Sequence, residues 1–147
     1  MSAFLLAGQH ILIQQRALGK YHTPGLWANT CCTHPEWEED PDRCATRRLR
    51  EELGIEGLPL RHCGQVDYRA GVGNGLIEHE VVEVYAGMAG LNLQLAPDPD
   101  EVMATRWVSR ATLLSDMAAT PAAFTLWLHI YMQQHADMIF GTVSLDA

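Results

Sequence analysis

The chain has 147 residues, 48% of them hydrophobic, so a single folded domain with one core is expected. Its formal net charge of −8 argues against nucleic acid or an anionic membrane as a partner. No apolar run approaches the roughly 20 residues of a membrane span, and residues 1–10 do not resemble a signal peptide. We therefore expect a cytoplasmic protein whose four cysteines stay reduced.

Short apolar and β-branched runs predict the strands. The segment at residues 71–75 is rich in glycine and predicts a hairpin-like connection between two of them. Residues 97–101, with alternating proline and aspartate, indicate a solvated turn. In chain order, the predicted strands cover residues 11–13, 26–30, 60–70, 77–86 and 104–108.

Helix signals occur at three places between these strands. Asp40 is typical of an N-cap before a helix at residues 41–53, and Gly54 stands where a C-terminal glycine belongs. A short helix is expected after Ser109, and a final helix at residues 121–134. Strands and helices mix without a regular βαβ rhythm, which predicts an α+β fold with a mixed sheet flanked by helices.

The helix expected at residues 41–53 carries two adjacent carboxylates, Glu51 and Glu52. Each stands four residues after an arginine, a spacing that on most helices gives ordinary surface ion pairs. Carboxylates are also the ligands that magnesium prefers, and magnesium in turn bridges phosphate oxygens. The helix is therefore a candidate platform for a metal that holds a diphosphate.

A second group of charges interrupts an otherwise apolar strand. Alternation along the strand places Glu78 and Glu80 on the same face as two valines. Carboxylates are costly beside apolar side chains unless something neutralises them, and a metal does so. The alternative is an exposed edge strand with solvated charges.

Cys32 and His34 lie two residues apart and add a thiol and an imidazole. Together with Glu78 and Glu80, the imidazole favours a borderline metal, manganese or zinc, although a lone histidine is more often structural. Cys32 is either a small buried apolar residue or, beside a metal that lowers its pKa, a proton donor or acceptor. Packing is expected for the other cysteines, Cys31, Cys44 and Cys63.

Three cations and two aromatic residues complete the set of candidates. Taken alone, Arg16 and Lys20 are ordinary surface cations, but with Arg48 they can clamp a diphosphate. Trp127 is a core residue by default, and in an active site its face stabilises a carbocation. Tyr68 is either a plain strand residue or a donor of a phenolic hydrogen bond.

Residues 33–55 resemble the Nudix box, and the chain is similar in most of its length to the type I isopentenyl-diphosphate isomerases. Thr33 and Arg48 depart from the general box, which has glycine and glutamate there, and both departures are typical of the isomerase branch. Supporting segments occur in the family's order at residues 16–20, 24–35, 68–70, 78–81 and 119–121. The box positions that fit are Glu39, Arg47, Leu49, Glu51, Glu52, Gly54 and Ile55.

The resemblance implies a Nudix-type α/β/α fold and the interconversion of isopentenyl diphosphate and dimethylallyl diphosphate. It implies that Cys32 and Glu80 are the acid/base pair, that Tyr68 assists Glu80, and that Trp127 stacks on the cation. The implied metal ligands are His34, Glu78 and Glu80 for manganese or zinc, and Glu52 for magnesium that arrives with the substrate. The implied diphosphate contacts are Arg16, Lys20 and Arg48.

Physical chemistry favours the isomerase over a hydrolase. An isomerase must add one proton to the substrate, remove another and keep water away from the cation. A hydrolase instead needs a metal-activated water and more carboxylates on the helix. Arg48 clamps phosphate and removes one such carboxylate. Two alternatives stay open: a Nudix hydrolase of another diphosphate, and a truncated, non-catalytic diphosphate-binding protein.

The domain is expected to span residues 1–147 and to lack the N-terminal segment that supplies two further metal-binding histidines in the family. The metal would then have three protein ligands and water. The sequence leaves open the oligomeric state, the metal at the histidine site, and which of Cys32 and Glu80 donates the proton.

Overall fold

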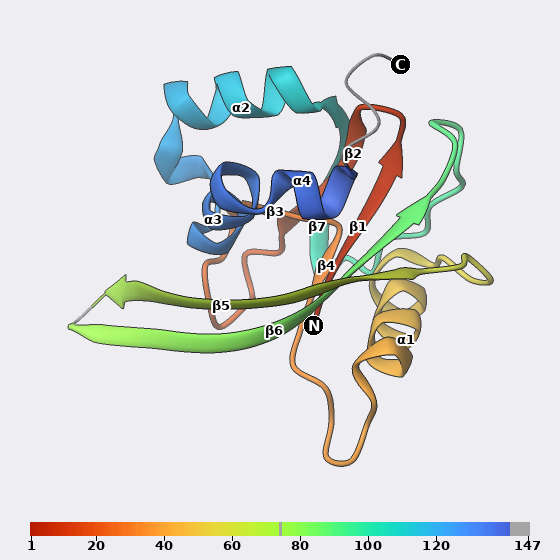
Figure 1. Ribbon diagram of the computed structural model, residues 1–147, viewed down its shortest axis with the longest axis horizontal. Helices are drawn as coiled ribbons and strands as arrows, with labels where there is room; N and C mark the ends of the chain where they lie inside the picture. Colours follow the sequence, from red (N-terminus) through yellow and green to blue (C-terminus); the bar gives the residue numbers. More distant parts are fainter. Residues whose placement is uncertain (74, 142–147) are drawn as a thin grey trace.

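The computed structural model describes residues 1–73 and 75–141, and the side chains of residues 70–73, 76 and 78 lie outside this description. Its centre is one sheet of seven strands (Figure 1). No helix among the described residues is long and apolar enough to cross a membrane. The strands are β1 (Ser2–Ala7), β2 (His10–Arg16), β3 (Trp27–Ala28), β4 (Cys31–Cys32), β5 (Arg61–Gly73), β6 (Leu76–Met88) and β7 (Val102–Ser109).

The strand order is β3-β2-β1-β6-β5, with β4 also paired to β1 and β7 to β2. β1 runs parallel to β6, whereas the other strand pairs are antiparallel. In this register Ser2 lies between Cys32 of β4 and Val84 of β6. The register therefore places Cys32 next to the centre of the sheet.

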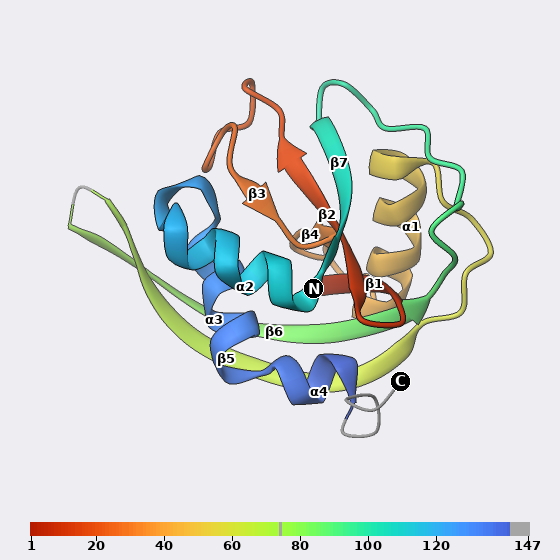
Figure 2. The same ribbon diagram turned by 90° about the horizontal axis from the view of Figure 1, so that it is seen from above.

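Helices cover both faces of the sheet (Figures 1 and 2). One core, which includes Leu5 and Leu49, lies beneath α1, and a second core, which includes Phe4 and Tyr131, lies beneath the helices that follow β7. This arrangement confirms the α+β fold with a mixed sheet flanked by helices. The helices are α1 (Pro41–Leu53), α2 (Arg110–Ala119), the 3-10 turn η1 (Pro121–Ala123), α3 (Leu126–Gln134) and α4 (Ala136–Phe140).

The boundaries predicted for α1 are confirmed. Asp40 is its N-cap residue, although the side chain makes no capping hydrogen bond. Gly54 adopts the left-handed conformation with φ of 69°, and its N–H donates to the carbonyl of Arg50. A Cβ at position 54 would lie 2.7 Å from the Cβ of Ala96, so glycine is needed for both conformation and space.

The C-terminal part differs from the sequence prediction. The single helix expected at residues 121–134 is wrong in its first part, because Pro121 opens only the turn η1. Thr125 then caps α3, since its buried side chain accepts a hydrogen bond from the N–H of Leu128. Neither α4 nor β1 was predicted. β1 is buried on both faces, so its residues after Ser2 are all apolar and show no alternation.

Candidate active site

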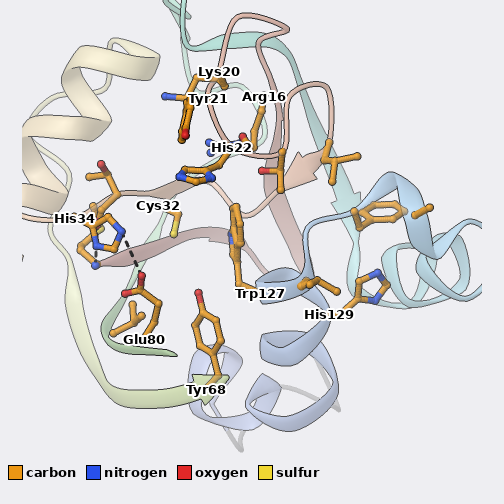
Figure 3. Close-up of a pocket in the computed structure, with 18 of the residues that line it drawn as sticks. Arg16, Lys20, Tyr21, His22, Cys32, His34, Tyr68, Glu80, Trp127 and His129 are labelled. Carbon is orange, nitrogen blue, oxygen red and sulfur yellow. Dashed lines mark hydrogen bonds and ion pairs between the residues drawn. The ribbon is translucent and has the colours of Figure 1, made fainter. Parts of the chain in front are cut away.

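A cavity of about 990 Å³ lies between the sheet and the segment that runs from η1 into α3 (Figure 3). Its walls come from the loop after β2, from β4 and the residues that follow it, from the β5–β6 hairpin, and from α3. Seven of the residues proposed from the sequence line it: Arg16, Lys20, Cys32, His34, Tyr68, Glu80 and Trp127. Arg48 and Glu52 are not among its lining residues.

Cys32 reaches the cavity from the end of β4. Its Sγ accepts a hydrogen bond of 3.2 Å from the Ser2 hydroxyl, which in turn lies 2.9 Å from the hydroxyl of Tyr131. Desolvation by the surrounding protein raises the pKa of the Cys32 thiol, although the Ser2 hydrogen bond acts in the opposite direction. The thiol is therefore neutral near pH 7 and has a proton to give.

Glu80 and Tyr68 lie directly opposite each other on β6 and β5. Both side chains point into the cavity, where Figure 3 shows them on the side opposite the loop after β2. His34 approaches from the segment after β4, and its Nε2 lies 3.4 Å from Oε1 of Glu80. The hairpin therefore delivers a carboxylate and a phenol as a cross-strand pair.

Two of the residues predicted to bind manganese or zinc, His34 and Glu80, lie close together. His34 and Glu80 meet at the cavity wall, and an imidazole with a carboxylate suits a borderline divalent metal. The side chain of Glu78, the third expected ligand, lies outside the described residues. Within the described part of the chain, no group of three or more His, Cys, Asp and Glu residues forms a metal cluster.

Trp127 is held in place by a buried asparagine that the sequence analysis did not single out. The indole Nε1 donates to Oδ1 of Asn29 at 3.2 Å. The Asn29 amide donates to the carbonyls of Ala3 and Cys31, at 3.0 Å each. Asn29 thus fixes the indole and the backbone beside Cys32 at once. Ser2 and Tyr131 were missed too, because they reach the thiol only through the tertiary fold.

The cations expected to bind a diphosphate are divided between the cavity and α1. Arg16 lies over the Trp127 ring, with its guanidinium carbon 5.5 Å from the ring centroid. Lys20 forms an ion pair with Glu101. Arg48 lies on α1, with Nη2 3.4 Å from carboxylate oxygens of both Glu52 and Glu101.

Glu52 is on the other side of the sheet from Cys32. Only 4% of the residue is exposed. The thiol of Cys31 donates to its Oε2 at 3.2 Å, and the amide of Gln14 donates to its Oε1 at 3.4 Å. Both oxygens of the Glu52 carboxylate are therefore engaged within the protein.

Comparisons with known proteins show the family of this chain. Residues 1–128 match the NUDIX domain. The isopentenyl-diphosphate Delta-isomerase of Rhodobacter capsulatus is 58% identical over 144 residues, which cover 98% of this chain and 82% of that protein. The isomerase of Dinoroseobacter shibae is 55% identical, with the same coverage of both chains. The chain belongs to the isopentenyl-diphosphate Delta-isomerase family.

Solved structures of other proteins share the NUDIX fold of this chain. A MutT NUDIX hydrolase from Burkholderia pseudomallei superimposes with a TM-score of 0.69 at 25% identity, covering 91% of this chain and 94% of that one. A protein from Deinococcus radiodurans has a TM-score of 0.71 at 20% identity, covering 88% of this chain and 77% of that one. The Nudix-type fold expected from residues 33–55 is confirmed.

Within the NUDIX motif of this isomerase-family chain, Glu39 and Arg47 form a bidentate ion pair. Nε and Nη2 of Arg47 donate to the two Glu39 oxygens at 2.7 and 2.9 Å. Arg47 also contacts Glu51 at 3.1 Å. The pair ties the loop before α1 to the helix, and the hydrogen bonds from Arg47 lower the pKa of Glu39 to about 2.

Proposed function

We propose that this protein isomerises isopentenyl diphosphate to dimethylallyl diphosphate by adding a proton to one carbon and removing a proton from another. The relatives above, 55% and 58% identical over nearly the whole chain, carry that activity in their names. The observation that carries the proposal is that Cys32 and Glu80 line one cavity, with Tyr68 and Trp127 beside them.

In the forward direction Cys32 protonates the terminal alkene carbon. Burial keeps the thiol neutral, so the proton is present when the substrate arrives. The alkene electrons form the new C–H bond, and a tertiary cation is left at C3. The hydrogen bond from Ser2 then stabilises the sulfur as it becomes a thiolate.

Glu80 completes the reaction by removing a proton from C2, and the C–H electrons form the new double bond. Tyr68, opposite Glu80 in the hairpin, is placed to assist that carboxylate. The thiolate and the protonated carboxylate return to their starting states by proton exchange with solvent. Because the interconversion is reversible, the two groups exchange roles in the backward direction.

The cavity walls suit a short-lived cation. The face of Trp127 offers the electron-rich surface that attracts positive charge. Apolar side chains such as Val82, Phe124 and Leu126 line the same space and limit the access of water that could capture the cation. Arg48 stands at a helix position where the general Nudix box has a carboxylate, so this motif helix has one metal ligand fewer for hydrolysis.

His34 and Glu80 are the residues that would hold a manganese or zinc ion, with Glu78 as the third expected ligand. Such an ion would supply positive charge beside the Glu80 carboxylate and would orient it toward the substrate. Glu52 as placed offers no free oxygen to the cavity, because Cys31, Gln14 and Arg48 engage it. In this arrangement the Glu52 carboxylate does not fit a magnesium ion that faces the cavity.

Incubation of the purified protein with isopentenyl diphosphate in deuterated water tests this function. We expect dimethylallyl diphosphate that contains deuterium, detected by mass spectrometry and proton NMR. Cys32→Ala should abolish the exchange, whereas the control Cys63→Ala, at a thiol that does not line the cavity, should retain it. Release of phosphate without exchange would indicate a hydrolase instead, and tight binding with neither reaction would indicate a non-catalytic binding protein.

A further inference from the structure

Two of the cations proposed to bind the diphosphate already hold a carboxylate of the chain itself. Oε2 of Glu101 forms an ion pair with Nζ of Lys20 and lies 3.4 Å from Nη2 of Arg48. Lys20 belongs to the loop after β2, and Arg48 belongs to α1. One carboxylate oxygen therefore joins the two elements that carry these cations.

The backbone of Glu101 is fixed, whereas its side chain is accessible. Its carbonyl accepts a hydrogen bond of 3.0 Å from the N–H of Ala17, and its N–H donates to Asp98 at 3.0 Å. Asp98 in turn donates to the carbonyl of Glu52 at 2.9 Å. The Glu101 side chain is 25% exposed, so its carboxylate can exchange for another anion without unfolding of the backbone around it.

Arg48 has a donor left over in this arrangement. Its Nη1 donates to Glu51 at 2.8 Å and its Nη2 lies near Glu52 and Glu101, but its buried Nε has no hydrogen-bond partner among the described residues. A buried donor without an acceptor is unfavourable. A diphosphate offers the Nη atoms of this guanidinium more acceptor oxygens than one carboxylate does.

We propose that Glu101 is a resident counter-ion that competes with the substrate's diphosphate for Lys20 and Arg48 and so sets the affinity of the site. This inference rests on the proposed isomerase function. Substrate, transition state and product all carry the same diphosphate, so binding energy there is uniform and does not lower the barrier at the carbons. A competing carboxylate keeps such binding moderate and lets the product leave.

A purely structural ion pair makes the opposite prediction. If Glu101 only positions Lys20 and Arg48, its removal leaves both cations less ordered and weakens diphosphate binding. If Glu101 competes, its removal frees both cations and strengthens binding. The sign of the change in affinity therefore separates the two roles.

The test compares wild type with Glu101→Gln, which keeps the size of the side chain and removes its charge. Asp100→Asn is the matched control, because it removes the same charge from the adjacent exposed residue, whose carboxylate contacts neither cation. Calorimetry with inorganic pyrophosphate gives Kd, and steady-state kinetics with isopentenyl diphosphate gives KM and kcat separately.

For Glu101→Gln we expect pyrophosphate to bind about two- to fivefold more tightly, as suits partly exposed ion pairs. KM should fall by a similar factor, with kcat unchanged or lower because product release slows. Glu101→Asp, whose carboxylate is one methylene shorter, should show a smaller change of the same sign. It also serves as the test variant if Glu101→Gln does not fold. Asp100→Asn should match wild type.

Unchanged or weaker pyrophosphate binding in folded Glu101→Gln would overturn the inference, as would an equal tightening in Asp100→Asn. The two proposals fail in distinguishable ways. Wild type that binds pyrophosphate but does not isomerise refutes the proposed function, and the Kd comparison still decides the role of Glu101. Wild type that isomerises, with no tightening in Glu101→Gln, refutes only the inference.

Discussion

Cys31 and Cys32 are adjacent residues that face opposite sides of the same sheet. The thiol of Cys31 lies in the core beneath α1, fully buried, and donates a hydrogen bond to Glu52. Cys32 faces the cavity, where its sulfur accepts a hydrogen bond from Ser2. Strand alternation alone separates the two, because successive side chains on a strand point to opposite faces.

The side chains that surround the two thiols also differ. On the α1 side, the ion pair between Arg47 and Glu39 holds the motif helix to the loop before it. On the cavity side, the polar groups of Cys32, Glu80 and Tyr68 share a space large enough for a small substrate. We infer that one face of the sheet is mainly structural and the other carries the chemistry.

Of the substitutions that separate the roles of the two thiols, Cys32→Ala should have the largest effect. Loss of a group that transfers the proton should lower kcat/KM about 10²- to 10⁴-fold, the usual contribution of a general acid or base. The melting temperature should change little, since Cys32 is only partly buried. Deuterium exchange and thermal unfolding of the same sample give both readouts. Turnover close to wild type would refute the role of Cys32.

Cys31→Ala should produce the reverse pattern. The substitution removes a fully buried sulfur and the donor to Oε2 of Glu52, so stability should fall by about 2 kcal/mol. Urea unfolding measures the loss, and kcat of the folded variant should remain close to wild type. A large loss of kcat with unchanged stability would contradict the division between the two faces.

Glu39→Gln tests whether the motif network stabilises the fold. Because the folded-state pKa of Glu39 is lowered to about 2, its stabilisation is present above the ordinary pKa of 4.5 and is lost as pH falls toward 2. The variant should melt at a lower temperature at neutral pH, and its stability should depend less on pH between 4.5 and 2. Identical acid unfolding of variant and wild type would exclude this role.

Ser2→Ala is the smallest of these changes. Without the hydroxyl donor, the Cys32 thiolate loses its hydrogen bond, so the pKa of Cys32 should rise further. At about pH 8.5, near the ordinary thiol pKa, alkylation of Cys32 by iodoacetamide should slow about two- to fivefold. Peptide mass spectrometry resolves Cys32 from the other thiols. Faster alkylation of Cys32 in the variant would contradict this reading of the hydrogen bond.

Local signals in the sequence predicted the ends of helices and the β5–β6 hairpin. The Asp40 and Gly54 boundaries of α1, the Ser109 cap of α2 and the long β5–β6 hairpin follow from capping and alternation. β1 could not be recognised in this way, because a strand covered on both faces has no period of two. For α3, the sequence predicted a helix that begins at residue 121, but the helix begins after Thr125, which has the buried capping position.

The residues of the candidate site also divide into those that the sequence predicted and those that it did not. Cys32, Glu80, Tyr68 and Trp127 could be proposed from motif residues, and the structure brings them to one cavity. Their supports, Ser2, Asn29 and Tyr131, are set by pairing between distant segments and leave no local signal. Residues 97–101 were expected to form only a solvated turn, yet Glu101 pairs with Lys20 and Arg48, which belong to two other segments.

The parallel pairing of β1 with β6 also governs when the protein can fold during synthesis. Ser2 pairs with Val84, and Leu6 pairs with Met88, so the central strand meets this neighbour only after more than half of the chain has been made. Until then, the apolar residues 3–7 of this strand lack their partner on that side, which exposes the strand edge to aggregation. The sheet that aligns Cys32, Ser2 and Val84 is therefore assembled late, and we expect slow, non-local folding for this chain.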